Sequence, residues 1–165
     1  MKKIIELLEN SIKNPSKGLP DEIFYFVGRL TPFVNVDLLI KHPTQGILLT
    51  MRDDEFTGKG WHFPGGIIRF RESWNFRVHE VAKNELYCNV DKINGPIAVN
   101  QIIASQQKER SHFISLMFEC YLNDQEFDLL LKRSKKEPKK INFFNSSPKN
   151  LLSWHKIYKH LFIFD

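Results

Sequence analysis

Hydrophobic residues recur along the chain with a helical period in some segments and in compact runs in others. The helical period marks four segments: residues 3–12, 20–27, 73–86 and 147–162. In the third of these, apolar residues recur every four positions, which predicts a buried stripe of Trp74, Val78, Ala82 and Leu86. Gly28 is a suitable stop for the second helix, and Ser147 is a suitable N-cap for the last one, which Pro148 then opens.

Compact apolar and β-branched runs predict strands at residues 34–41, 46–51, 97–104, 112–121 and 141–144. The turn-forming residues 42–46 separate the first two runs, which is typical of a hairpin. One or two helical turns are expected at Glu126–Lys132. Because strands precede and follow an internal helix and a helix closes the chain, the pattern predicts an α/β sandwich with a mixed β-sheet.

The length and composition narrow the class of protein. A chain of 165 residues with 42% hydrophobic and 26% charged residues is typical of one globular domain, which excludes disordered and fibrous classes. No apolar run approaches the roughly 20 residues of a membrane span, and the N-terminus lacks the apolar core of a signal peptide. We therefore expect a cytoplasmic protein without membrane contact, in which Cys88 and Cys120 are reduced thiols.

Positive charge is concentrated in one place. The net charge is +5, and residues 132–140 hold six of the 24 Lys and Arg residues. This run is either a solvated loop or a lip that attracts phosphate groups. No sequence signature of a nucleic-acid-binding fold accompanies it, so no dedicated nucleic-acid binding is expected.

The segment from residue 60 to residue 90 carries the chemistry. Pro64-Gly65-Gly66 lets the backbone turn sharply and expose its amides and carbonyls. Five residues separate Gly66 from Glu72, which precedes the predicted helix, and Glu85 lies on the helix face beside the buried stripe. This arrangement resembles the box of the Nudix hydrolase family: Gly, five residues, Glu, seven residues, then Arg-Glu-hydrophobic-any-Glu-Glu-any-Gly-hydrophobic.

The second half of the box departs from the family pattern. Glu80 stands at the position of the Arg, Val81 and Asn84 stand at the positions of two metal-binding carboxylates, and only Glu85 keeps the third. Tyr87 stands at the position of the Gly, so a left-handed helix end is expected from Asn89 instead.

These departures resemble those of one branch of the family, the GDP-mannose mannosyl hydrolases, which also keep only the last carboxylate. Residues 30–40, 46–52 and 60–66 resemble the first two strands of that branch and its approach to the box. The resemblance implies a Nudix-type α/β/α sandwich with a mixed β-sheet over residues 30–165, preceded by a helical segment over residues 1–29. It also implies a homodimer, in which we expect residues 1–30 at or near the interface.

The resemblance further implies a single Mg²⁺ and no other cofactor. The ligands that it suggests are Glu85, the Gly65 carbonyl, Glu72 and Glu137. Glu72 is alternatively a structural carboxylate at the helix start, where the helix dipole favours an anion. Glu137 stands near the position of the metal-binding glutamine of the branch.

The catalytic residues suggested by the resemblance are Arg52, Asp37 and His112. Arg52 would stabilise a departing diphosphate, and Asp37 would bind a sugar hydroxyl because a carboxylate in mid-strand needs a specific partner. His112 resembles a strand histidine of the branch and is alternatively an ordinary strand-end residue. The general base of the branch is a histidine in the loop before its last strand. That histidine is absent from residues 136–140, which leaves several candidates open: Glu137, His112, His155 and His160.

Two functions from different classes follow. The first is Mg²⁺-dependent hydrolysis of a GDP-mannose-like nucleoside diphosphate sugar, by attack of water on the sugar carbon, with a conventional pyrophosphatase attacking phosphorus as a variant. The second is a Nudix-fold protein that binds a nucleotide with little or no turnover. The surviving Gly66, Glu72 and Glu85 favour the first function, and the altered loop at residues 136–140 favours the second.

Overall fold

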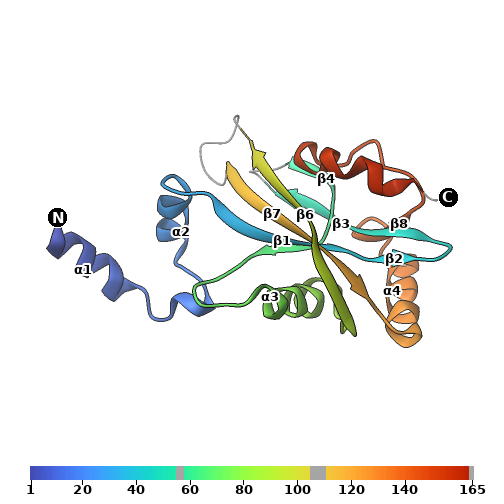
Figure 1. The fold of residues 1–165 in the computed structure, drawn as a ribbon, viewed down its shortest axis with the longest axis horizontal. Helices are drawn as coiled ribbons and strands as arrows, with labels where there is room; N and C mark the ends of the chain where they lie inside the picture. Colours follow the sequence, from blue (N-terminus) through green and yellow to red (C-terminus); the bar gives the residue numbers. More distant parts are fainter. Residues whose placement is uncertain (55–57, 105–110, 164–165) are drawn as a thin grey trace.

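The computed structural model describes residues 1–54, 58–104 and 111–163. Two β-sheets form its centre, with helices on both sides (Figure 1). The first sheet has the order β5-β1-β7-β6. Its strands are β1 (Phe33–Leu39), β5 (Gly65–Ile67), β6 (Lys92–Ile103) and β7 (His112–Tyr121). β1 and β7 are parallel and the other neighbours are antiparallel, so this sheet is mixed, as predicted.

The second sheet is antiparallel and smaller. It is made of β2 (Lys41–His42), β3 (Gly46–Asp54), β4 (Gly58–His62) and β8 (Ile141–Phe144), with β3 paired to the other three. β1 and β3 were expected to form a hairpin, but they lie in different sheets. The hairpin is confined to residues 41–42 and 46–47 because β1 pairs with β5 and β7 instead.

Helices cover both faces of the sheets (Figure 1). One side carries α3 (Trp74–Val81), which continues as the single π-helical turn η2 (Ala82–Leu86), together with α4 (Asp124–Lys136). The other side carries the 3-10 helix η3 (Ser153–Phe162). The N-terminal segment contains α1 (Lys2–Ser11), the short η1 (Pro15–Lys17) and α2 (Asp21–Gly28).

Two hydrophobic cores result, one on each face. β1 contributes residues to both cores, because successive side chains of a strand point to opposite faces of the sheet. Val36 and Leu38 belong to the core under α3, whereas Leu39 belongs to the core under η3. β3 shows the same division, with Leu48 in the first core and Ile47 and Leu49 in the second, so this strand is apolar at successive positions without a polar alternation. Both cysteines are free and lie in the first core, where burial raises the pKa of each thiol to about 12.

Several local predictions differ from the structure, and three of them concern the ends of helices. Trp74 is 48% exposed, so the buried stripe of α3 begins at Val78. The last helix begins at Ser153 rather than after Ser147, because Leu151 first forms a β-bridge with Trp61. The left-handed residue at the end of the π turn is Tyr87, with φ of 58°, rather than Asn89.

The N-terminal segment contacts the sheets unevenly. The ring of Phe24 in α2 stacks on Phe33 of β1 at a centroid distance of 4.6 Å. By contrast, α1 has no buried residue and projects from the rest of the molecule (Figure 1). In the described part of the chain, none of the helices combines the length and hydropathy needed to cross a membrane.

Candidate active site

A pocket of about 140 Å³ opens on the η3 side, where both sheets contribute residues. Its polar lining comes from Asn35, Asp37, Arg52, His62 and His155. Its apolar lining includes Phe63, Ile67, Ile102, Phe113 and Trp154. A few convergent polar groups beside aromatic walls are typical of a small-ligand site.

Asp37 is the charged group at the floor of this pocket and is 1% exposed. Its Oδ1 atom accepts a hydrogen bond from Asn35 at 2.8 Å, and its Oδ2 atom accepts one from Ser115 at 2.5 Å. The Nε2 atom of His155 lies 3.5 Å from the same Oδ2. Burial alone would raise the pKa of this carboxyl, but the interactions with His155, Ser115 and Asn35 together hold that pKa below its usual value. Asp37 is therefore an ionised acceptor at neutral pH.

The hydrogen bonds to Asp37 continue into the core. Ser115 has one hydroxyl hydrogen, which it donates to Asp37, so Tyr158 must be the donor in its 2.7 Å contact with Ser115. A carboxylate has about four acceptor positions, and three of those on Asp37 are used by side chains that the structure describes. The remaining capacity lies on Oδ1, which faces Gly65 closely: a Cβ at Gly65 would come within 2.5 Å of this oxygen.

His155 comes from η3, far from Asp37 in the sequence. Its Nδ1 atom accepts a hydrogen bond from the backbone N–H of Phe63 at 3.1 Å. A ring nitrogen that accepts cannot carry a proton, so the hydrogen of the neutral ring is on Nε2, facing Asp37. Both ring nitrogens of His155 are thus engaged within the protein.

His62 lies beside His155, with a ring-centroid distance of 6.0 Å. Its Nδ1 atom donates to the carbonyl of Phe63 at 2.7 Å, and its Nε2 atom accepts from the hydroxyl of Thr50 at 3.1 Å. Burial, and then the neighbouring His155 and Arg52, lower the pKa of His62 to about 3. His62 is therefore neutral throughout the physiological range.

Glu85 belongs to η2 and therefore lies on the α3 side of the sheets, opposite to η3. It approaches the pocket at the sheet edge that β5 forms. Its carboxylate accepts a hydrogen bond from the backbone of Gly65. Burial raises the pKa of this carboxyl to about 7, the Asp37 carboxylate acts in the same direction, and Arg52 and Gly65 oppose it. Glu85, Gly65, Asp37 and Arg52 therefore lie close enough to influence one another.

The pairing of β1 with β5 directs the backbone of Gly65 toward this edge. Leu38 N–H donates to Pro64 and Ile68 N–H donates to Val34, which makes 38/64 and 34/68 hydrogen-bonded pairs. Hydrogen-bonded and non-hydrogen-bonded pairs alternate along antiparallel strands, and the pair Asp37/Gly65 lies one residue from the hydrogen-bonded pair 38/64. The N–H and C=O groups of Gly65 therefore both point away from β1. The Gly65 carbonyl is thus oriented toward the side from which Glu85 approaches.

Arg52 occupies the pocket end of β3. Its Nε atom donates to Asp54 at 2.7 Å, and about a third of its side chain is exposed. This ion pair orients the guanidinium and leaves it accessible from the pocket. An oriented, accessible guanidinium is suited to bind phosphate oxygens.

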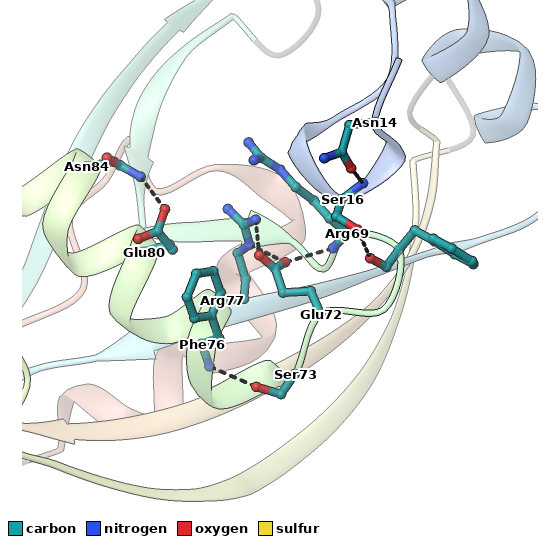
Figure 2. Close-up of polar contacts among 10 residues, drawn as sticks. Asn14, Ser16, Arg69, Glu72, Ser73, Phe76, Arg77, Glu80 and Asn84 are labelled. Atoms are coloured by element: carbon teal, nitrogen blue, oxygen red, sulfur yellow. Dashed lines mark hydrogen bonds and ion pairs between the residues drawn. The ribbon is translucent and has the colours of Figure 1, made fainter. Parts of the chain in front are cut away.

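Glu72 lies outside the pocket. Figure 2 shows its carboxylate held by the guanidinium of Arg77 and by the backbone N–H of Arg69. The Nε and Nη2 atoms of Arg77 donate to the carboxylate at 2.8 and 2.5 Å, and the N–H of Arg69 donates to it at 2.8 Å. Burial would raise the pKa of Glu72, but the hydrogen bonds from Arg77 and Arg69 hold it below its usual value. Arg77 lies about one helical turn before Glu80, the residue that stands at the position of the Arg in the family pattern. The geometry is that of a structural carboxylate.

The remaining candidates are spread over other parts of the surface. His112 begins β7, lies within 3.0 Å of Gln101 and does not line the pocket. Glu137 pairs with Arg133 and Lys140 at the end of α4. His160 is exposed on η3. Of the four candidates for a base, the structure brings only His155 into the pocket.

The donor set limits what metal could bind. In the described ranges 1–54, 58–104 and 111–163, no three His, Cys, Asp or Glu side chains group as a ready-made metal site. Proteins commonly hold Mg²⁺ by one or two carboxylates together with substrate phosphates and water. The half-buried carboxylate of Glu85 and the outward carbonyl of Gly65 fit one such ion. Val81 and Asn84 in place of carboxylates do not fit a cluster of ions.

Comparison with known proteins defines the fold. No protein-family model matches the sequence. The chain is 26% identical over 123 residues to the low-salt glycan biosynthesis protein Agl8 of Haloferax volcanii, over 73% of this chain and 78% of that protein. Its structure is similar to that of a MutT Nudix hydrolase from Burkholderia pseudomallei, with a TM-score of 0.58 and 17% identity over 79% of this chain and 98% of that chain. The chain has the Nudix fold. A MutT protein from Methanosarcina mazei is also similar, with a TM-score of 0.53 and 15% identity over 80% of this chain and 94% of that chain.

Several residues of this Nudix-fold pocket are not predicted by the sequence. Asn35 and Ser115 sit on predicted strands, but their hydrogen bonds to Asp37 depend on the pairing of β1 with β7. His62 and Trp154 had no distinguishing local pattern. The one available signal was that Asn35 and Asp37 are two residues apart on a strand and so share a face.

Proposed function

We propose that this chain is a hydrolase of nucleoside diphosphate sugars, GDP-mannose-like in substrate class, that works with one Mg²⁺. The observation that carries the proposal is the grouping of Glu85, Gly65, Arg52 and Asp37 beside one aromatic-walled pocket. A carboxylate, a guanidinium and an oriented carbonyl can together receive a metal-bound diphosphate, and a buried ionised carboxylate can receive hydroxyl groups.

Mg²⁺ would be held by Glu85 and the Gly65 carbonyl, and when bound it would offset charge on the diphosphate. Arg52 would bind the same diphosphate, and its positive charge matters most as the leaving group departs. Asp37 would accept a hydrogen bond from a sugar hydroxyl or from the attacking water through the free capacity of Oδ1. The half-buried rings of Phe113 and Trp154 would pack against the ring of the ligand.

In the proposed reaction, the oxygen of water bonds to the anomeric carbon of the sugar and the bond from that carbon to the diphosphate oxygen breaks. One proton is released, and the products are the free sugar and the nucleoside diphosphate. A single ion can neutralise the departing diphosphate, whereas attack at phosphorus is commonly supported by several ions. The similarity to a glycan biosynthesis protein supports a substrate that contains a sugar.

Hydrolysis in ¹⁸O-labelled water tests this proposal. Purified protein would be incubated with Mg²⁺ and a panel of nucleoside diphosphate sugars, and the products would be separated by mass spectrometry. Label in the released sugar supports attack at carbon. Label in a phosphate product would instead identify a pyrophosphatase.

A second candidate is nucleotide binding with little or no turnover. It is favoured by the state of the two histidines in the pocket, His62 and His155, whose ring nitrogens are all engaged by partners within the protein. Neither ring offers a free lone pair to activate water, and general-base assistance is typically worth about 10²–10⁴-fold in rate. Calorimetric binding of GDP with Mg²⁺, combined with no product from any substrate in the panel, would support this candidate.

A further inference from the structure

The helix that carries Glu85 ends in an unusual way. The π turn of η2 closes with a hydrogen bond from the backbone N–H of Tyr87 to the carbonyl of Ala82, and Cys88 N–H reaches the same carbonyl at 3.3 Å. Tyr87 has φ of 58° and ψ of 37°, a left-handed conformation that favours glycine. For another residue this conformation costs roughly 1–2 kcal/mol, so the turn needs support from outside the helix.

A single side chain from α4 supplies that support. The Nη1 atom of Arg133 donates to the carbonyls of Glu85 and Leu86, both at 3.0 Å. The guanidinium carbon also lies 4.7 Å from the centre of the Tyr87 ring, in a cation–π contact. Arg133 therefore contacts three consecutive residues at the C-terminal end of the helix, where a cation is also favoured by the helix dipole.

Glu137 completes this arrangement. Glu137 directly follows the last residue of α4, and its Oε2 atom lies 3.7 Å from the Nε atom of Arg133, one helical turn earlier. The guanidinium is therefore held from one side by Glu137 and contacts the π turn on the other. The remaining lysines of the basic run, such as Lys135, Lys136 and Lys139, are exposed.

We propose that Arg133 is a positioning residue for Glu85: its guanidinium holds the π turn in place of the glycine that this chain lacks at Tyr87. Glu137 acts through Arg133, by orienting it, rather than as a metal ligand. The proposal deepens the proposed function and rests on it for the catalytic role of Glu85, but the structural part can be tested without substrate.

Amide hydrogen exchange measured by NMR tests the structural part. Arg133→Met keeps the aliphatic length and removes the donors, and we expect exchange at Tyr87 and Cys88 to accelerate about tenfold or more, because hydrogen bonds to charged groups are among the strongest. Lys132→Met, on the same helix, is the matched control and should change neither amide. Leu38 and Phe118, in the core, report global stability and should exchange as in the wild type.

Two further variants distinguish positioning from general stability. Tyr87→Gly removes the left-handed penalty, so adding Arg133→Met to it should accelerate exchange less than in the wild-type background. Arg133→Lys keeps the charge without the fork geometry and should give an intermediate effect. Unchanged exchange at Tyr87 and Cys88 in Arg133→Met, or equal acceleration at all amides, would overturn the proposal.

The catalytic part uses the substrate identified by the hydrolysis panel. We expect Arg133→Met to raise the Mg²⁺ concentration for half-maximal turnover severalfold while KM at saturating Mg²⁺ changes little. If the panel yields no substrate, the proposed function fails while the exchange result still decides the role of Arg133. If turnover and its Mg²⁺ dependence are unaffected although exchange accelerates, Arg133 supports the helix without positioning Glu85.

Discussion

The Nδ1 atom of His155 accepts a 3.1 Å hydrogen bond from the backbone N–H of Phe63, a residue 92 positions earlier in the chain. This contact joins η3 to the segment that leads into Gly65. It also fixes the ring so that Nε2–H faces the Oδ2 atom of Asp37 at 3.5 Å. The C-terminal helix is thus part of the pocket rather than a cover for its core.

We expect His155→Phe to lose stability and ligand binding together. The substitution leaves the Phe63 N–H buried without its acceptor and removes one of the donors to Asp37, and an unsatisfied buried group costs about 1–3 kcal/mol. Urea unfolding and a ligand titration would measure both effects. His160→Phe, an exposed position on the same helix, is the control and should change neither. Wild-type stability in His155→Phe would contradict the assigned hydrogen bonds.

The two glutamates of the box are expected to respond in opposite ways. Glu72→Gln leaves Arg77 buried without its counterion, which should lower the free energy of unfolding by about 3 kcal/mol or more. Glu85→Gln removes a charge that burial disfavours, so it should retain stability while losing Mg²⁺-dependent activity or ligand binding. Chemical denaturation of both variants, alongside Mg²⁺ titrations, provides the comparison. Unchanged Mg²⁺-dependent affinity in Glu85→Gln would remove the metal assignment.

Local patterns predicted much of this fold, and the family resemblance named three residues that line the pocket, Asp37, Arg52 and Gly65, but not the contacts that these residues make. The box helix and the strand Ile141–Phe144 follow from apolar periodicity and β-branched runs, which depend on neighbouring residues. The division of β1 and β3 between two sheets does not, because strand partners are chosen by contacts between distant segments. For the same reason, nothing near His155 in the sequence indicates that it contacts Asp37.

The ion pair at Glu72 shows how a motif can mislead. The family pattern has an Arg at position 80, where this chain has Glu80, whereas the Arg that pairs with Glu72 is the buried Arg77, about one helical turn earlier. Similarly, Glu137 resembled a metal ligand by its place before the last strand, but its side chain contacts Arg133 and Lys140. A motif gives the residue type expected at each position, whereas the contacts between these side chains depend on the three-dimensional structure.

Arg52→Ala should lower kcat more than it raises KM. The guanidinium is oriented by Asp54 and faces the pocket, so its charge would stabilise a leaving diphosphate more than a bound one. Lys59→Ala is the matched control, since Lys59 pairs with Asp53 in the adjacent surface ion pair and is well exposed. Steady-state kinetics with the substrate from the panel would separate the two parameters. Identical kinetics for Arg52→Ala and the wild type would make Arg52 an ordinary surface residue.

The lowered pKa of His62 predicts that the stability of the protein depends on pH. Its pKa is about 3 in the folded protein against 6.5 as its ordinary value, so between these pH values the unfolded chain binds one more proton than the folded one. Protonation therefore favours unfolding, and the contribution to stability is complete above pH 6.5 and lost as the pH falls toward 3. The loss amounts to roughly 1.4 kcal/mol per pH unit, or about 2 kcal/mol at pH 5.

His62→Gln isolates this effect, because the amide can donate to Phe63 and accept from Thr50 but does not titrate. Urea unfolding at pH 7 and pH 5 should show that the wild type loses about 2 kcal/mol more than His62→Gln over this interval. His42→Gln, at a partly exposed histidine, is the control and should lose as much as the wild type. Equal losses in the wild type and His62→Gln would mean that His62 is protonated in the folded protein.

The N-terminal helix leads to the last prediction, a homodimer with residues 1–30 at or near the interface. α1 has no buried residue and exposes Ile4, Ile5, Leu7 and Leu8 along one face. An isolated helix of ten residues is marginal in water, so an apolar face of this kind needs a surface to cover it. A second copy of the chain is the partner we propose, since two-fold pairs are the commonest oligomers.

Light scattering at micromolar concentration should therefore give twice the monomer mass of 19.5 kDa. Leu7→Glu places a charge in the apolar face and should shift the mass toward the monomer, because burying an unpaired carboxylate is costly. Asn10→Glu makes the same change of charge on the polar face of α1 and should leave the dimer intact. A monomeric mass for the wild type would reject the dimer, and a dimer that survives Leu7→Glu would place its interface away from α1.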